Sequence, residues 1–316
     1  MTTRAATDAS KDSAQISGSS GIRRRSISDW YADPFRRPRT LAAITWAYIA
    51  WSLLPILITI RISFNEGRSR SSFQGWSAKW WTGPGDSLLH NPDLSNAMRN
   101  SVKLAVLTMV IATPIGVALS LGLARWRGFG RRPANMLMLI PLVTPELVMG
   151  GALLLVFTEL LRSIGLGQTA QLIGHVTFTI SYVVVITRGR LFTIGRDVEE
   201  AAQDLGATPL QAIRTVLLPM MAPAVFTSAM IVFATSLDDF VISAWLASDV
   251  SDETVPIRIY SAAKRAPTPS LNALATFMMV CTFAAIALGM VLPRVLRRGE
   301  KAARGSSVEE FAALDL

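Results

Sequence analysis

Cysteine and histidine are nearly absent from this chain of 316 residues, which contains only Cys281, His90 and His175. A single cysteine excludes an internal disulfide, and two histidines leave little from which to build a metal site. The sequence has no G-x-x-x-x-G-K-[ST] phosphate-binding loop. We also expect no Ser/His/Asp or Cys/His catalytic set, because the two histidines fall in separate spans or loops. The sequence therefore predicts a protein that is not an enzyme and has no metal or cofactor site.

Charged residues are scarce too, at 17% of the chain, whereas hydrophobic residues make up 51%. Soluble globular proteins carry about 25% charged residues, so this deficit indicates that lipid is the main solvent. A helix needs about 20 apolar residues to cross the bilayer core, and six runs qualify, without the alternation of a barrel wall. We therefore predict an all-α membrane protein with six transmembrane helices, at Leu41–Ile62, Val102–Leu123, Ala134–Leu161, Leu172–Thr187, Met220–Leu246 and Leu271–Leu292. The fourth is the shortest, because Arg188 and Arg190 end it.

The distribution of basic residues predicts how the chain is organised and oriented. Residues 1–40 are expected to form a flexible basic tail, 41–295 the transmembrane domain and 296–316 a second tail, without a cleaved signal peptide. The side that holds both termini carries 21 Lys and Arg residues, and the opposite side carries 10. Cytoplasmic segments carry the excess of Lys and Arg, so both termini are predicted to be cytoplasmic. The net charge of +9 thus reflects topology rather than nucleic-acid binding.

The first outer loop, from about residue 63 to residue 100, is rich in tryptophan. It contains Trp76, Trp80 and Trp81. Tryptophan favours the headgroup layer, so we expect a short segment that lies on the membrane surface. Anchoring is the simpler role for this segment, and contact with a partner protein is the alternative.

The fourth loop, about residues 196–219, is cytoplasmic in this topology and has a clear helix–turn–helix pattern. Gly206 can adopt the left-handed conformation that ends a helix. Thr208 can cap the next helix, and Pro209 suits its first position. Pro219 and Pro223 are expected to bend the start of the fifth span.

Seven positions of this loop resemble the coupling motif of ABC importer permeases: Glu200, Ala201, Ala202, Gly206, Val216, Leu218 and Pro219. The alternative is a generic helical loop with a Gly-Pro turn. The resemblance implies a type I ABC importer permease in a bacterial cytoplasmic membrane, with both termini inside. It also implies ABC ATPase subunits, a second homologous permease subunit and an extracytoplasmic solute-binding protein as partners. The residues that it assigns to ATPase coupling are Glu199, Glu200, Ala201, Ala202, Gly206, Pro209, Val216, Leu218 and Pro219.

The predicted fifth span contains two adjacent carboxylates, Asp238 and Asp239. A carboxylate at the bilayer centre costs about 2.5–3.5 kcal/mol on insertion scales, so neither is expected to face lipid. Successive helix residues point about 100° apart, so at most one of the two faces a pore squarely. Two interpretations stay open: an acidic site on a path for cations, or a structural cap or inter-subunit ion pair. Glu146, after Pro145, is a candidate helper, and Tyr182 and Trp245 could stack on an alkylammonium.

Further segments resemble the spermidine/putrescine permeases, in particular the second of the two permease subunits that such importers use. They are Asn100–Val102, Pro145–Met149, Ala201–Ala207, Leu237–Asp239, Val255–Ser261 and Leu271–Thr276. The resemblance implies a polyamine cargo. Related importers of opines, phosphonates, thiamine or iron share much of this pattern and remain alternatives. An ion-coupled secondary transporter would be expected to have repeated halves, which the sequence lacks.

Overall fold

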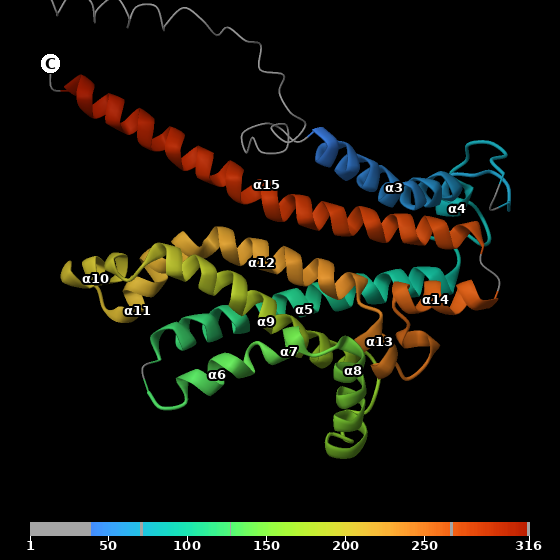
Figure 1. Ribbon diagram of the computed structural model, residues 1–316, viewed down its shortest axis with the longest axis horizontal. Coiled ribbons are helices and arrows are strands. Elements are labelled where there is room, and N and C mark those ends of the chain that lie inside the picture. Colours follow the sequence, from blue (N-terminus) through green and yellow to red (C-terminus); the bar gives the residue numbers. More distant parts are fainter. Residues whose placement is uncertain (1–38, 70–71, 127, 266–267, 315–316) are drawn as a thin grey trace, which may run out of the picture. The chain divides into compact units, whose positions relative to one another are not determined.

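Every regular element that the computed structural model describes, over residues 39–69, 72–126, 128–265 and 268–314, is helical. The long or medium helices are α3 (Arg39–Ser63), α5 (Pro92–Arg125), α8 (Glu146–Leu155), α9 (Gln168–Ile194), α10 (Asp197–Asp204), α12 (Leu218–Asp238), α14 (Val255–Arg265) and α15 (Pro269–Leu314) (Figure 1). The shorter ones are α4 (Lys79–Thr82), α6 (Arg131–Leu137), α7 (Ile140–Val143), η1 (Val156–Leu160), α11 (Pro209–Ala212), η2 (Ile213–Leu217), α13 (Val241–Leu246) and η3 (Val250–Asp252). The tail predicted for residues 1–40 lies, up to residue 38, outside the described residues.

Five helical stretches in the described part of the chain are long and apolar enough to cross a membrane. They are Thr40–Ser63, Pro92–Arg125, Gln168–Ile194, Pro209–Asp238 and Pro269–Leu292. The third predicted span, Ala134–Leu161, is not one straight helix, because Arg131–Val143 and Glu146–Leu160 are bent by 106° at a break that contains Thr144 and Pro145. Six spans result only if this bent pair counts as one. The fourth span is longer than predicted, since α9 continues through Arg188 and Arg190 to Ile194.

The chain divides into two units, Met1–Leu54 and Pro55–Leu316. The described part of the first unit is the beginning of α3, whose side chains are mostly apolar on every face, as expected for a helix in lipid. The second unit contains the rest of α3 and all later elements.

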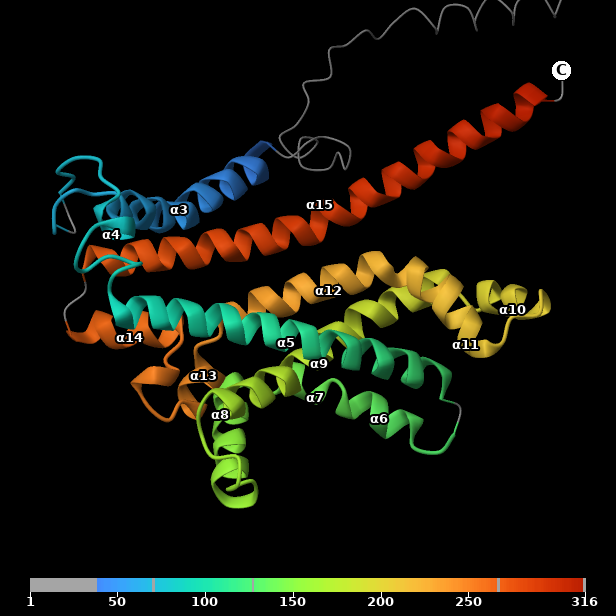
Figure 2. The ribbon, with the colours of Figure 1, turned by 180° about the vertical axis from the view of Figure 1, so that it is seen from behind.

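Helices α5, α9 and α12 form the centre of the second unit, where each packs against the other two (Figures 1 and 2). Their contact is lined by Ala112 and Val117 of α5, Val183 of α9 and Val232 of α12. Small residues let membrane helices approach closely, and Gly116 shows how closely here. A Cβ atom at Gly116 would lie 2.5 Å from the Cβ atom of Val183. The α5–α9 contact therefore depends on the missing side chain.

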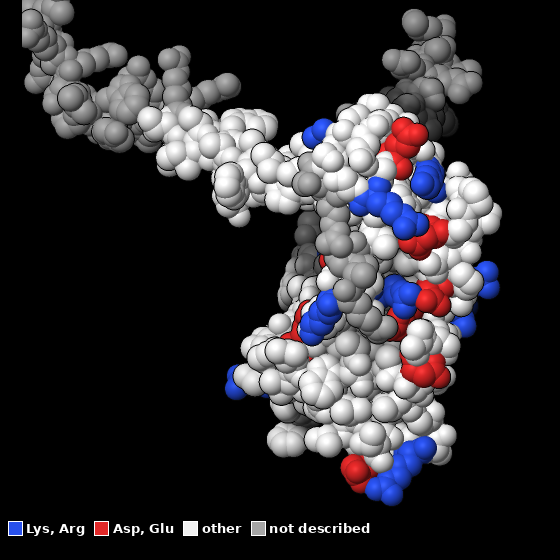
Figure 3. Space-filling model, turned by 90° about the vertical axis from the view of Figure 1, so that its right-hand side faces the viewer, with Lys and Arg blue, Asp and Glu red and all other residues white. Residues whose placement is uncertain are grey.

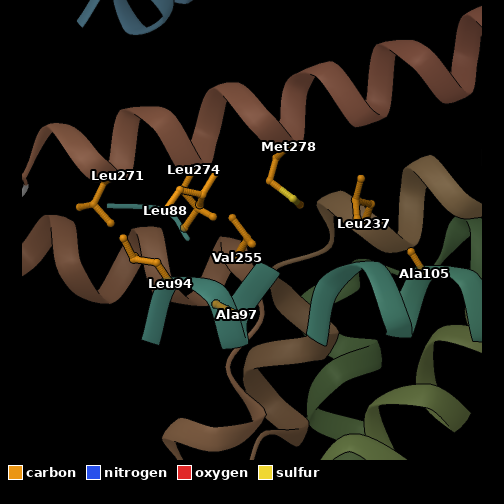
Figure 4. Close-up of a cluster of buried hydrophobic side chains, with 9 residues drawn as sticks. All are labelled: Leu88, Leu94, Ala97, Ala105, Leu237, Val255, Leu271, Leu274 and Met278. Carbon is orange, nitrogen blue, oxygen red and sulfur yellow. The ribbon is translucent and has the colours of Figure 1, made fainter. Parts of the chain in front are cut away.

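A second buried cluster joins the N-terminal half of α5 to α12, α14 and α15 (Figure 4). Its members are Leu88, Leu94, Ala97, Ala105, Leu237, Val255, Leu271, Leu274 and Met278. Leu237 precedes the acidic pair directly, so this cluster positions the end of α12 against α14 and α15.

Polar contacts hold together the end of the unit that carries α4 and α14. The side chain of Asn91 caps α5 by accepting from the backbone N–H groups of Asp93 and Leu94, at 3.0 and 3.3 Å. Arg258 of α14 forms ion pairs with Asp93 of α5 and, at 3.4 Å, with Glu253. Figure 3 views this end and shows acidic side chains beside basic ones.

The tryptophans of the first loop do not share one role. Trp80 is only 2% exposed, and its Nε1–H donates to the carbonyl oxygen of Asn65 at 2.7 Å. Trp81 stacks on Phe64, with 5.3 Å between ring centroids, while Trp76 is 73% exposed. The prediction of a surface segment is therefore wrong for Trp80, which packs inside the protein and holds the loop together.

The glycine at the α5–α9 contact gives a direct test of this packing. We expect Gly116→Ala to destabilise the protein by about 1–3 kcal/mol, since the added methyl group overpacks a full contact. Gly122→Ala, in the same helix, adds the same methyl group where nothing lies within 4 Å. That control should be neutral or stabilising, because alanine favours a helix by about 1 kcal/mol over glycine. Thermal unfolding of the purified variants measures the difference, and equal midpoints would contradict the packing described here.

Candidate functional site

Helix α10 is attached to the end of α5. Glu199 forms an ion pair with Arg125, and Arg196, just before α10, donates to the carbonyl oxygen of Ala124 at 3.2 Å. Three acidic residues, Asp197, Glu199 and Glu200, lie in the first turn of α10, where the helix dipole favours negative charge. The sequence resemblance assigned both Glu199 and Glu200 to ATPase coupling. In the structure, the Glu199 carboxylate instead binds within the chain, and Glu200 is exposed.

The turn after α10 has the predicted construction. Gly206 has a φ of +91°, in the left-handed region that favours glycine. The Thr208 side chain accepts from the N–H of Gln211, and Gln211 Oε1 accepts from the N–H of Thr208 at 2.8 Å. This reciprocal pair is a complete capping box at the start of α11, with Pro209 in the first turn. The helix stop at Gly206 and the cap at Thr208 are confirmed, and Gln211 is the member that the sequence reading missed.

Two exposed leucines flank this turn. Leu205 is 90% exposed and Leu210 is 59% exposed, on either side of Gly206 and Pro209. Both lie inside the motif but were not singled out from the sequence. The signal that could have identified them is a large apolar residue at each edge of a polar turn.

Of the other motif residues, Ala201, Pro209 and Pro219 are exposed, while Ala202, Val216 and Leu218 are half-buried. The buried residues that hold this segment are Ala212 and Leu217 instead. Directly before Pro219 the chain forms the π-helical turn η2, rather than ordinary α-helix. Proline lacks the N–H that an α-helix needs, so a local change in hydrogen bonding at this position is expected.

The prediction that the fifth span runs to Leu246 is wrong. Helix α12 ends at Asp238, Asp239 is extended with φ −67° and ψ 124°, and α13 begins at Val241. Hydropathy does not detect this break because the residues on both sides are apolar. The two adjacent acids therefore lie at a helix break, and their side chains have different surroundings.

Asp239 is bound inside a buried polar network. Its Oδ2 atom accepts from the N–H of Ser243 at 2.9 Å and lies 3.2 Å from Nε2 of His175. His175 also contacts the hydroxyls of Ser236, at 2.8 Å from Nδ1, and Ser243, at 2.9 Å from Nε2. Gln171, one turn before His175 on α9, donates to the carbonyl oxygens of Ser243 and Asp252 at 3.0 and 3.2 Å. This network joins α9 to both sides of the break.

Serine, histidine and aspartate side chains lie together in this network, a proximity that their positions in the sequence did not indicate. Residues far apart in the sequence are brought together by the packing of α9 against α12 and α13. His175 is only 1% exposed, and both of its ring nitrogens have partners. The arrangement joins helices and offers no access to a substrate.

Asp238, in contrast, faces open space. Among the described residues it has no hydrogen-bond or ion-pair partner. It lines one cavity of about 430 Å³ together with Glu146, Asp239 and Thr235, and a second of about 630 Å³. Cavities of this size suit small-molecule ligands. The two broken helices, α7–α8 with Glu146 and α12–α13 with Asp238, thus contribute acids to the same cavity.

The predicted aromatic residues lie elsewhere. Tyr182 packs against Phe178, with 5.5 Å between ring centroids, in the cluster between α9 and α13. Trp245 is 41% exposed and covers Gly150 of α8, where a Cβ atom would lie 2.5 Å from its ring. Neither residue lines the two cavities next to Asp238.

The aromatic residues that do line the larger cavity are Phe240, Tyr260 and Phe283. The sequence reading passed over them, although Phe240 directly follows the acidic pair. Tyr260 reaches the cavity because α14 packs beside the next helix, α15, and no local sequence pattern indicates this contact.

Comparisons with known proteins agree on one family. The family described as binding-protein-dependent transport system inner membrane component matches residues 112–301. The spermidine/putrescine transport system permease protein PotC of Haemophilus influenzae is 35% identical over 252 residues, covering 80% of this chain and 95% of that protein. The putrescine transport system permease protein PotI of Escherichia coli is 32% identical, covering 78% and 86%.

A solved structure has the same fold. A chain of a bacterial ABC transporter involved in the import of the acidic polysaccharide alginate aligns with a TM-score of 0.63 at 18% identity, covering 81% of this chain and 95% of that one. At this identity the likeness concerns the fold.

The different surroundings of the two acids give a prediction about stability. Asp239→Ala should destabilise the protein by about 1–3 kcal/mol, because it leaves the buried partners of the carboxylate unsatisfied. Asp238→Ala should change stability by less than about 0.5 kcal/mol, since it removes no contact among the described residues. Thermal unfolding of both variants tests this, and a reversed order would contradict the assignment of the network.

Proposed function

The chain belongs to the family of binding-protein-dependent transport system inner membrane components, and on that premise we propose that it is the permease subunit of an ATP-driven ABC importer for polyamines, putrescine or spermidine. The observation that carries the proposal is the 35% identity to a spermidine/putrescine permease over 80% of this chain. The unpartnered carboxylate of Asp238 beside a cavity supports a cationic cargo rather than a neutral or anionic one.

Residues 196–219 form the segment that docks on the ATPase subunits in this proposal. Leu205, Leu210, Glu200 and Ala201 are exposed around the Gly206 turn, where a partner's groove can take up apolar surface. The ion pair between Glu199 and Arg125 supports this role, because it ties α10 to a long helix of the bundle. The ATPase subunits provide the energy, and a second homologous permease and an extracytoplasmic binding protein complete the importer.

The protein lies in a bacterial cytoplasmic membrane in this proposal, with both termini in the cytoplasm. The surplus of Lys and Arg on the side of the termini supports this orientation. It places α10 and α11 on the ATPase side and α14 on the side of the binding protein.

The cation path passes Asp238 and Glu146 in this proposal. An alkylammonium that leaves bulk water needs a counter-charge, and a carboxylate without a partner of its own can provide one. Asp239 supports the path indirectly, because its contacts with Ser243 and His175 hold the helix break from which Asp238 projects.

Removing the charge of Asp238 tests the cargo. Asp238→Asn should reduce uptake of labelled putrescine by at least about tenfold, because a charged hydrogen bond contributes about 1.5–3 kcal/mol. The matched control is Glu159→Gln, which alters an exposed acid that is paired with Arg162. ATPase binding by both variants should equal that of the wild type. Normal putrescine uptake by Asp238→Asn would overturn the site and favour a neutral or anionic cargo.

The turn at Gly206 gives a test of the coupling role. Gly206→Val should abolish transport and the stimulation of ATP hydrolysis, because a β-branched residue is strained at a φ of +91° and the turn would change shape. Gly206→Asn is the matched control, since asparagine tolerates the left-handed conformation, and it should retain most of the activity. Membrane levels of both variants are measured alongside. Full coupling in Gly206→Val would show that this turn does not serve the ATPase.

A further inference from the structure

Two aromatic rings and one carboxylate meet at the larger cavity. The rings of Phe240 and Tyr260 are 4.8 Å apart between centroids and tilted by 50°. Both line the cavity of about 630 Å³, together with Asp238. Phe240 comes from the helix break and Tyr260 from α14, so the ring pair forms only in the folded protein.

An ammonium group already occupies the face of Tyr260. The Nζ atom of Lys264, one turn further along α14, lies 4.2 Å from the centroid of the Tyr260 ring. Within the described part of the chain, Lys264 has no carboxylate partner. The aromatic ring is therefore its principal electrostatic contact, in the range where cation–π attraction operates.

The lysine side chain has the same chemistry as a primary alkylamine. It ends in an –NH₃⁺ group on a flexible chain of four CH₂ groups. Its position on Tyr260 therefore shows where, and in what geometry, this ring accepts an alkylammonium. Asp238, which lines the same cavity as Tyr260, has no partner of its own among the described residues, and Lys264 reaches the ring from outside the lining of the cavity.

We propose that the Phe240–Tyr260 ring pair is an ammonium-binding site of the transport cavity and that Lys264 is its resident occupant, which an ammonium group of the cargo displaces. This inference rests on the proposed polyamine transport. Asp238 binds an ammonium group by charge, while the rings bind one by their π faces. Lys264 lowers the affinity of the ring site for cargo, and it refills the site when the cargo leaves.

The test measures equilibrium binding of labelled putrescine to the assembled permease–ATPase complex in nanodiscs, without the binding protein, so that affinity reports the cavity. Lys264→Met keeps the length of the side chain but removes the ammonium. It should tighten putrescine binding by about three- to sixfold, the ratio expected when a competitor held by an exposed cation–π contact is removed. Lys264→Arg keeps a cation that stacks on the ring and should give no tightening.

Tyr260→Leu separates competition for the ring from a general effect of charge. Alone it should weaken putrescine binding, whereas Tyr260→Phe keeps the aromatic face and should bind like the wild type. In the Tyr260→Leu background, adding Lys264→Met should no longer tighten binding. A gain that persists without the ring would mean that Lys264 acts only by long-range repulsion, and this result would overturn the proposal. Unchanged affinity in Lys264→Met would overturn it as well.

Uptake by the wild-type complex with its binding protein is measured in parallel. Putrescine uptake by the wild type together with unchanged affinity in Lys264→Met would refute the ring site alone. A wild-type complex that takes up neither putrescine nor spermidine would instead refute the proposed function, and the ring-site proposal that rests on it.

Discussion

A helix that breaks inside an apolar bundle leaves backbone groups that lipid cannot satisfy, and the rest of this structure depends on how those groups are bonded. After α12 ends at Asp238, the carboxylate of Asp239 accepts the N–H of Ser243 in the first turn of α13. Helix α9 adds further hydrogen bonds on both sides of the break. Gln171 donates to the carbonyl of Ser243, His175 binds two serine hydroxyls, and the N–H of Gly167 donates to the carbonyl of Leu246. The backbone N–H of Ser243 is thus bonded by a carboxylate of the break itself, and α9 holds both sides of the break through side-chain and backbone contacts.

These hydrogen bonds explain why the adjacent residues Asp238 and Asp239 have different surroundings. The side chain of Asp239 is only 6% exposed and bonds to Ser243 and His175 at the break, whereas the side chain of Asp238 faces the cavity. The second break, at Thr144 and Pro145, places Glu146 at the start of α8 and at the same cavity. Continuous helices would carry these acids on faces fixed by the helical period. The two breaks instead bring these acids to one cavity.

The sequence predicted the local features of this fold well. The apolar runs located the spans, and Gly206, Thr208 and Pro209 predicted the helix–turn–helix from single residues with strong conformational preferences. The sequence-based prediction failed where contacts between residues far apart in the sequence determine the structure. Composition cannot place a break between apolar segments such as those around Asp239, and it cannot show that Trp80 is buried. For the candidate site, Asp238 and Glu146 were found from the cost of charge in a membrane. Tyr260 was missed because only the packing of α14 brings it to the cavity, whereas Phe240, next to the acidic pair in the sequence, was passed over.

Helix α5 has an ion pair at each end, Asp93 with Arg258 of α14 and Arg125 with Glu199 of α10. Its 34 residues form a single helix of about 50 Å, at about 1.5 Å per residue. Its ladder of hydrogen bonds lacks one donor, because Pro114 lies inside the helix and has no N–H. The helix nevertheless links two distant parts of the protein, because α10 is attached to one of its ends and α14 to the other. The spacing between the attachment points of α10 and α14 is thus set by the length of one helix.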